Sequence, residues 1–89
     1  MKITFDAVKD ASNQTKHGCS LADAQRLEWD EALLWPDQRR DYGELRMVAL
    51  APMGERLFYV VFVDRAMTRR VISLRKANNR EFNKYATNY

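Results

Sequence analysis

The 89-residue sequence has one cysteine, one histidine, two prolines and three glycines. Because Cys19 is alone, an internal disulfide is excluded, and with His17 as the sole histidine no Cys/His zinc site is expected. No apolar run approaches the roughly 20 residues that a membrane-spanning helix needs. The N-terminus reaches an acid at Asp6, too early for a signal peptide. We therefore expect a cytoplasmic protein with neither metal nor cofactor.

Apolar and charged residues are both plentiful. The chain is 46% hydrophobic and 30% charged, which is typical of a folded protein rather than a disordered one. Its length allows a single modest core. We therefore expect one domain that spans residues 1–89.

Charge is distributed unevenly along the chain. Residues 1–44 carry six lysines and arginines against nine acids, whereas residues 45–89 carry nine against three. Arginine outnumbers lysine seven to two in the second half, which suits bidentate contact with phosphate. The basic half favours a polyanion or an acidic protein as partner, although ordinary surface charge would look the same.

The most basic stretch is the segment from Arg69 to Ala77, which reads as a short strand running into a helix. Strict alternation places Arg69, Val71, Ser73 and Arg75 on one face and Arg70, Ile72 and Leu74 on the other. Such a strand is either a charged edge strand that discourages aggregation or a platform that binds phosphates.

The first half reads as a strand followed by helices. Lys2–Phe5 is a short strand, and Asp6 caps a helix over Ala7–Lys16 that Gly18 ends. Ser20 opens a second helix, which ends near Trp29 and Asp30. The apolar residues that follow form core or a lid over it, with base stacking as the alternative. They are Trp29, Leu33, Leu34 and Trp35, followed by Pro36.

The second half reads as strands. A polar turn over Asp37–Gly43 precedes a strand over Leu45–Ala51, a turn at Pro52–Gly54 and a continuous apolar strand over Leu57–Val63. The last of these is predicted to lie at the centre of an antiparallel meander with Arg69–Arg75. Asn78 or Asn79 caps a final helix with an apolar stripe, on which we expect Phe82 to pack into the core. The stripe comprises Phe82, Tyr85, Ala86 and Tyr89. The fold class is therefore α+β, a small antiparallel sheet packed with helices in the order β-α-α-β-β-β-α.

Three clusters could carry chemistry. Lys16-His17 ends the first helix, where a cation is favoured by the helix dipole and a histidine can also exchange a proton near neutral pH. Glu44 and Arg46 project to one face of their strand, as an ion pair or as part of a site. The third cluster gathers cations suited to a phosphoryl transition state. It comprises Arg70, Ser73 and Arg75 with Arg80 and Tyr85.

Together the clusters fit a metal-independent ribonuclease. A base would take the proton of a ribose 2′-hydroxyl, whose oxygen attacks the adjacent phosphorus while arginines stabilise the added charge. Arginine stays protonated, so the base or acid is left to Lys16, His17 or Glu44. The sequence has no Walker loop, dinucleotide-binding glycine motif or HExxH zinc motif. It also lacks a helix-turn-helix pattern, which argues against a DNA-binding repressor.

The sequence resembles the BrnT toxins of bacterial BrnT–BrnA type II toxin–antitoxin systems over nearly its whole length. The resemblance is carried by Asn13…Lys16-His17-Gly18 with Ser20, Trp29-Asp30, Asp41…Gly43-Glu44…Arg46, Arg70–Ala77 and Arg80-Glu81…Tyr85. It implies a RelE-like ribonuclease toxin fold and RNA cleavage that inhibits translation and bacterial growth. By position, it implies catalytic roles for Lys16, His17, Glu44, Arg46, Arg70, Arg75 and Tyr85. We expect additional RNA contacts from Arg69, Ser73, Lys76 and Arg80.

The resemblance also implies a partner. This would be a cognate BrnA-like antitoxin with a dimeric ribbon-helix-helix portion, in a heterotetramer that reaches operator DNA only through the antitoxin. We expect the antitoxin to cover part of the basic face, because a surface built for phosphates also suits acidic side chains. The alternative is a non-catalytic RNA- or protein-binding module, a degenerate toxin that would need the cations but no titrating base.

Overall fold

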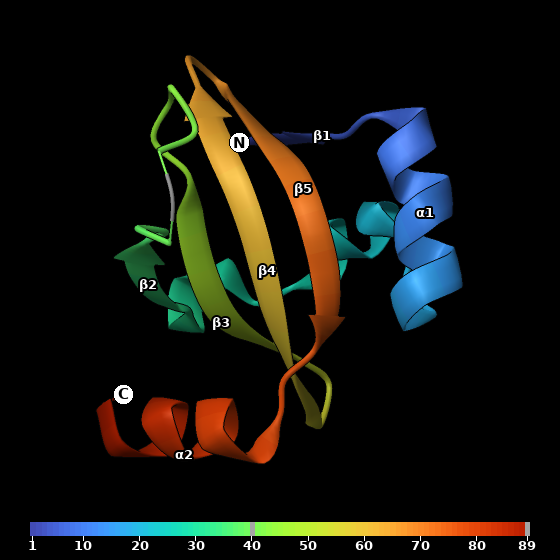
Figure 1. Cartoon of the computed structure of the whole chain (residues 1–89). Helices are drawn as coiled ribbons and strands as arrows, with labels where there is room; N and C mark the ends of the chain where they lie inside the picture. The colour runs from blue at the N-terminus through green and yellow to red at the C-terminus, as the bar shows by residue number, and fades with distance from the viewer. Residues whose placement is uncertain (40, 89) are drawn as a thin grey trace.

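The computed structural model describes residues 1–39 and 41–88. It contains a five-stranded sheet in the order β1-β5-β4-β3-β2, in which β1 is parallel to β5 and the other neighbours are antiparallel. Figure 1 shows α1 beside β5, the segment after α1 behind the sheet, and α2 across its lower end. The elements are β1 (Lys2–Thr4), α1 (Ala7–His17), η1 (Leu21–Arg26), η2 (Trp29–Glu31), β2 (Leu33–Pro36), β3 (Met47–Met53), β4 (Arg56–Arg65), β5 (Thr68–Lys76) and α2 (Asn79–Asn88).

The first helix begins and ends as the sequence predicts. The Asp6 carboxylate accepts a hydrogen bond from the Lys9 backbone N–H at 2.9 Å, which satisfies one of the free donors of the first turn. At the other end Gly18 adopts a left-handed conformation with φ of 70°, and its N–H bonds to the Gln14 carbonyl. The cap and the glycine therefore fix α1 within a residue of its expected length.

The predicted second helix is wrong in kind. Residues 21–26 and 29–31 form two short 3₁₀ helices, although Ser20 does cap the first of them. Leu21, Ala24 and Leu27 are buried against the sheet. The tighter 3₁₀ geometry eclipses residues three apart, so these three side chains align on one side. Their tertiary packing therefore outweighs the local preference for an α-helix.

The order of elements has one strand more than predicted. Leu33–Pro36 forms the edge strand β2, paired with β3 through Leu33 and Leu50 at one end and Pro36 and Met47 at the other. Pro36 is tolerated as its last residue because proline suits strand ends and sheet edges. These residues were expected only as core or lid.

The central part of the sheet matches the prediction of a meander with its apolar strand in the middle. β4 pairs with β3 on one side and β5 on the other. Phe58, Val60 and Phe62 point to the back face, where they pack with Leu21 and Leu74 in the core. β3 begins at Met47 rather than Leu45 and continues through Met53, so the turn lies at Gly54 and Glu55.

The final helix does not contribute to the core. Asn78 and Glu81 form a reciprocal cap, in which Asn78 Oδ1 accepts the Glu81 N–H at 2.8 Å and Glu81 Oε1 accepts the Asn78 N–H at 2.9 Å. α2 has no buried residue, and Phe82 is 56% exposed. The expectation that Phe82 packs into the core is therefore wrong, because the helix lies across the end of the sheet (Figure 1). Tyr89, predicted to share its stripe, lies outside the described residues.

Candidate nucleic-acid interface and active site

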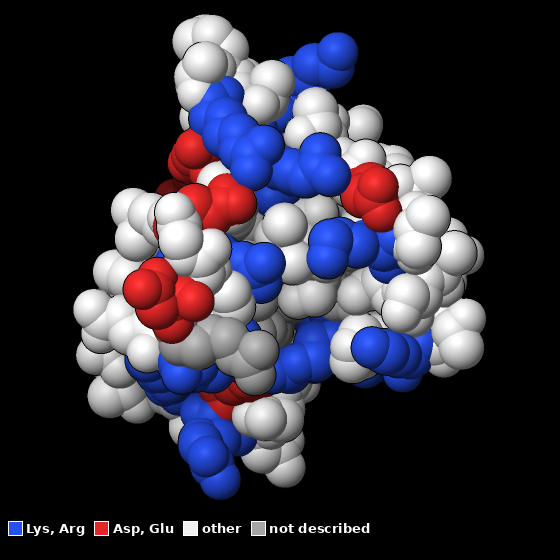
Figure 2. Space-filling model, turned by 45° about the horizontal axis from the view of Figure 1, so that its top comes forward, with Lys and Arg blue, Asp and Glu red and all other residues white. Residues whose placement is uncertain are grey.

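A β-bulge decides which basic side chains share a face of β5. Phe62 pairs with Val71, but the next residue back on β4, Val61, pairs with Ser73, so Ile72 is the extra residue. The predicted strict alternation is therefore wrong across this point. Arg70, opposite Val63, shares the front face with Ser73, opposite Val61, and with Arg75, opposite Tyr59, whereas Arg69 shares the back face. Figure 2 shows lysine and arginine side chains over much of the front of the molecule.

One end of the front face holds a cluster of four charged residues, which we call the Glu44 cluster: Glu44, Arg46, Arg65 and Arg70. Glu44 lies before β3, so its predicted place on a strand face is wrong. One guanidinium nitrogen of Arg65 donates to both Glu44 carboxylate oxygens, at 2.8 and 3.0 Å. The hydrogen bond from Arg65 lowers the pKa of Glu44, and the charges of Arg46 and Arg70 lower it further. Glu44 is therefore a carboxylate held in its ionised form among arginines.

Arg46 extends the front face by one residue beyond β3. Its carbonyl accepts the Asp37 N–H at 2.8 Å, which continues the β2–β3 pairing, so its side chain lies on the same side as that of Val48. The guanidinium carbon lies 4.0 Å from the centre of the Tyr42 ring. The buried Nε has no hydrogen-bond partner among the described residues. Arg46 is thus positioned by an aromatic ring rather than by an acid.

The opposite end of the front face holds the Arg75 cluster, which comprises Tyr59, Arg75 and Glu81. The Arg75 guanidinium donates to both Glu81 carboxylate oxygens at 2.8 and 2.7 Å and lies 4.1 Å from the centre of the Tyr59 ring. Burial alone would raise the pKa of Glu81, but hydrogen bonds from Arg75 and from the Asn78 N–H outweigh it and the pKa is lowered. The bond to Glu81 raises the pKa of Arg75. Both charges are therefore fixed, and the arginine is held in one orientation.

Lys16 and His17 meet the sheet at Ser73. A small pocket of about 170 Å³ is lined by both of these residues together with Asn13, Ile72 and Ser73. The buried Asn13 amide donates to the Leu74 carbonyl at 2.8 Å and accepts the Leu74 N–H at 3.1 Å, so it continues the ladder of β5 as another strand would. Asn13 also donates to the Cys19 carbonyl at 2.8 Å. These bonds fix the last turn of α1 beside Ser73.

Asp37 anchors the loop that carries Glu44 and Arg46. Its side chain is only 1% exposed and accepts hydrogen bonds from the Arg39 guanidinium at 2.8 and 2.9 Å and from the Tyr42 hydroxyl at 3.2 Å. The bonds from Arg39 lower the pKa of Asp37 from 3.8 to about 2, against the opposing effect of burial. Part of the predicted Asp37–Gly43 turn, Arg40, lies outside the described residues.

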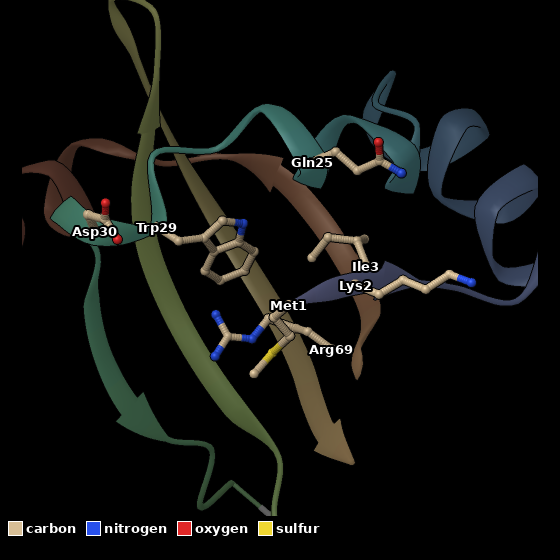
Figure 3. Close-up of a pocket in the computed structure, with 7 residues that line it drawn as sticks. All are labelled: Met1, Lys2, Ile3, Gln25, Trp29, Asp30 and Arg69. Carbon is tan, nitrogen blue, oxygen red and sulfur yellow. The ribbon is translucent and has the colours of Figure 1, made fainter. Parts of the chain in front are cut away.

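Arg69 does not belong to this interface, so its predicted place beside Ser73 and Arg75 is wrong. Its side chain is 18% exposed, forms a bidentate pair with Asp64 at 2.7 and 2.9 Å, and lies 4.5 and 4.3 Å from the ring centres of Trp29 and Phe62. Figure 3 shows Arg69 and Trp29 converging on a back-face pocket of about 560 Å³, with the Lys2 side chain directed away. Arg69 therefore packs over the aromatic part of the core.

The remaining predicted residues lie near one end of β5 or on α2. Lys76 is the last residue of β5 and is exposed, as is Arg80 in the first turn of α2. The Tyr85 hydroxyl donates to the Glu31 carbonyl at 2.7 Å, which ties α2 to η2. The structure therefore does not bring Tyr85 to the Glu44 cluster, with which it was grouped as catalytic.

Four residues that position this face were given no role from the sequence: Asn13, Asp37, Tyr59 and Glu81. Only Glu81 had a local signal, because it follows Asn78 by three residues in a capping-box pattern. The others act through partners distant in the sequence or through a neighbouring strand. Among the described residues, no group of three or more His, Cys, Asp or Glu is placed to hold a metal ion. No helix in that part of the chain is long and apolar enough to cross a membrane.

Comparison with known proteins identifies the family. A family model described as the ribonuclease toxin BrnT of a type II toxin–antitoxin system matches residues 5–81. The 1.1 Å crystal structure of the Brucella abortus ribonuclease toxin BrnT is similar to this fold, with a TM-score of 0.70 and 28% sequence identity over 89% of this chain and 99% of that one. No curated protein matches the chain. Because the family model spans most of its length, the chain belongs to the BrnT family of ribonuclease toxins from type II toxin–antitoxin systems.

Proposed function

We propose that this chain is an endoribonuclease that cleaves RNA without a metal ion and thereby inhibits translation and bacterial growth. The observation that carries the proposal is the bulge at Ile72, which aligns Arg70, Ser73 and Arg75 on the face that Lys16 and His17 border. An RNA backbone that lies along this face would meet cations at both ends of the strand. Fixed positive charge of this kind stabilises the pentacoordinate transition state that a metal ion stabilises in other nucleases.

His17 is the best candidate for the general base or the general acid of the reaction. A base removes the proton of the ribose 2′-hydroxyl, the 2′-oxygen bonds to the adjacent phosphorus, and the bond to the 5′-oxygen breaks as an acid protonates it. The products are a 2′,3′-cyclic phosphate and a 5′-hydroxyl. Glu44 is a weaker candidate for the base because its bond to Arg65 lowers its pKa. His17 borders this face with an imidazole, the side chain that most often serves as general acid or base, and Lys16 lies beside it in the same pocket.

RNA cleavage by the purified chain in EDTA tests the proposal. We expect wild type to cut, and His17→Ala, Arg70→Ala and Arg75→Ala each to lose about 10²-fold or more in rate between about pH 5 and 9. Arg26→Ala is the matched control, because Arg26 is an exposed arginine on η1 behind the sheet. Cleavage that disappears in EDTA and returns with a divalent cation would overturn the metal-independent mechanism. RNA binding without cleavage, with or without ribosomes, would favour the non-catalytic binding module.

The type II family assignment implies an antitoxin. We propose a BrnA-like ribbon-helix-helix partner in a heterotetramer, with acidic side chains over Arg70 and Arg75. The support is charge complementarity with the basic front face (Figure 2). Cross-linking of the complex should place the antitoxin on β5 and α2, and links confined to the back face would contradict the proposal.

A further inference from the structure

A second pocket opens on the front face beside the Arg75 cluster. It has a volume of about 310 Å³ and lies where β2 meets the loop that follows it. Its apolar lining comes from Trp35, Val48 and Tyr59, and its polar lining comes from Asp37, Gln38 and Arg39. No catalytic role predicted from the sequence falls on these residues, and for Trp35 alone base stacking was the alternative to a place in the core or in a lid over it.

The apolar lining is aromatic and held in place. The Trp35 and Tyr59 rings meet edge to face, with centres 6.3 Å apart and planes at 67°. Each ring also lies against a cation, Lys84 at 3.9 Å from the Trp35 ring centre and Arg75 at 4.1 Å from that of Tyr59. Rigid aromatic side chains next to positive charge are the combination on which single-stranded nucleic acids stack their bases.

The polar lining offers groups that can read the edge of a base. Gln38 is exposed, and its side-chain amide makes no hydrogen bond to another described residue. It therefore presents both a donor and an acceptor to the pocket. Asp37 and Arg39 are bonded to each other and therefore hold the pocket wall in one shape. Sequence-specific RNA recognition combines this kind of edge contact with stacking.

The pocket lies at the right distance from the proposed cleavage site. On the front face the row Trp35, Val48, Val61 and Ser73 crosses four adjacent strands, so Trp35 is three strand spacings, roughly 14 Å, from Ser73. Tyr59 is directly paired with Arg75. A phosphate held by Arg75 and Ser73 would therefore place a neighbouring nucleotide over Tyr59 with its base toward Trp35.

We propose that this pocket binds a nucleobase of single-stranded RNA, one nucleotide away from the cleaved phosphodiester. The ligand class is a heteroaromatic base, recognised by Trp35 and Tyr59 through its ring and by Gln38 through its edge. The proposal rests on the proposed function for the choice of RNA. It adds that cleavage depends on the identity of a flanking base.

Chimeric oligonucleotides test the dependence. A single ribonucleotide in a deoxy strand fixes the cleaved bond, and each flanking base is varied or replaced by an abasic residue. We expect wild type to lose about tenfold in rate with the abasic residue on one side. Trp35→Leu should cleave the intact strand about tenfold more slowly than wild type does, and the abasic residue should not lower its rate further. Equal abasic losses in Trp35→Leu and wild type would overturn the proposal.

Gln38→Ala tests the reading of the base edge. It should narrow the spread of rates among the four bases at that position, whereas Gln25→Ala, an exposed glutamine at the back-face pocket, should leave the spread unchanged. A spread that is the same in Gln38→Ala and wild type would contradict the role of Gln38.

A binding measurement separates failure of this proposal from failure of the ribonuclease. The chain has two tryptophans, so ¹⁵N NMR resolves two indole N–H signals, assigned by the loss of one in Trp35→Leu. Nucleoside monophosphates should shift the Trp35 signal saturably, and ribose 5-phosphate, which lacks a base, should not. Base binding without cleavage of any RNA would refute the ribonuclease alone. A Trp35 signal that only the antitoxin protein shifts would refute the nucleobase pocket.

Discussion

At the scale of single residues, Asp37 holds the loop between β2 and β3 in place through its buried carboxylate. It is the acceptor for Arg39 and Tyr42, and its backbone N–H continues the β2–β3 pairing. The loop that presents Glu44 and Arg46 is therefore organised around one buried carboxylate. Charge-assisted hydrogen bonds of this kind are costly to remove, because the partner groups lose an acceptor.

The pH dependence of stability follows from the lowered pKa of Asp37. Because the folded pKa is about 2 and the ordinary value is 3.8, the contribution is present above about pH 4 and is lost as the pH falls toward 2. We expect Asp37→Asn to lower the free energy of unfolding by about 1–2 kcal/mol at pH 7, since Arg39 is largely exposed and its contribution is screened. The difference from wild type should shrink on acidification.

Urea denaturation at pH 7 and again near pH 2.5 measures both effects. Asp30→Asn is the control, because Asp30 is exposed and makes no hydrogen bond through its carboxylate among the described residues. A difference between Asp37→Asn and wild type that does not change with pH would contradict the assignment.

At the scale of elements, α2 is attached by polar contacts rather than by apolar burial. Glu81 binds Arg75, Tyr85 binds the Glu31 carbonyl and Lys84 lies over Trp35. The helix therefore contacts residues of the front face and buries none of its own residues in the core. Elements with little buried surface open most easily, so α2 should exchange its amide hydrogens faster than β4.

Glu81→Gln separates the two possible effects of the Glu81–Arg75 pair. Gln can still accept the Asn78 N–H, so the cap of α2 persists while the charge on Arg75 is no longer matched. If Glu81 positions Arg75, the rate of RNA cleavage should fall about three- to tenfold with little change in KM and in helix content. A faster enzyme would show instead that Glu81 competes with the phosphate for Arg75.

At the scale of the whole molecule, the front face should act as one electrostatic surface. We expect the logarithm of the RNA association constant to fall linearly with the logarithm of the salt concentration. Arg70→Met should reduce the magnitude of that slope by about 0.7 for single-stranded RNA. Arg69→Met is the matched control, because Arg69 adjoins Arg70 in sequence but lies on the back face against Trp29 and Phe62. Filter binding or fluorescence anisotropy at several salt concentrations measures both slopes. Equal reductions in the two variants would contradict the division of the faces.

Local signals in the sequence were sufficient for part of the fold. Asp6 and Gly18 mark the two ends of α1 in the sequence, because a cap and a left-handed glycine act within one turn. The run from Leu57 to Val63 reads as a central strand because it is apolar throughout. The strand β2 could not be predicted in the same way. It has only four residues and exists because β3 pairs with it.

The candidate site shows the same division. The sequence alone singles out Lys16, His17 and the arginines of β5 as residue types suited to a site. The structure brings Lys16 and His17 to Ser73. Which arginines lie on the front face depends on the register of β4 against β5, which no pattern within β5 reveals. The role of Asn13 likewise depends on Leu74, 61 residues away.

The bulge at Ile72 means that the composition of the cationic face depends on one residue of β5 that has no partner on β4. If Ile72 were instead taken into strict pairing, with Ser73 and Arg75 held in place, Arg70 would face the core and Arg69 the solvent. A slip that leaves every charge in the protein would thus exchange the partners of two arginines. Deletion of Ile72 would instead remove the bulge and leave Arg70 on the front face, because Val71 would keep its pairing with Phe62.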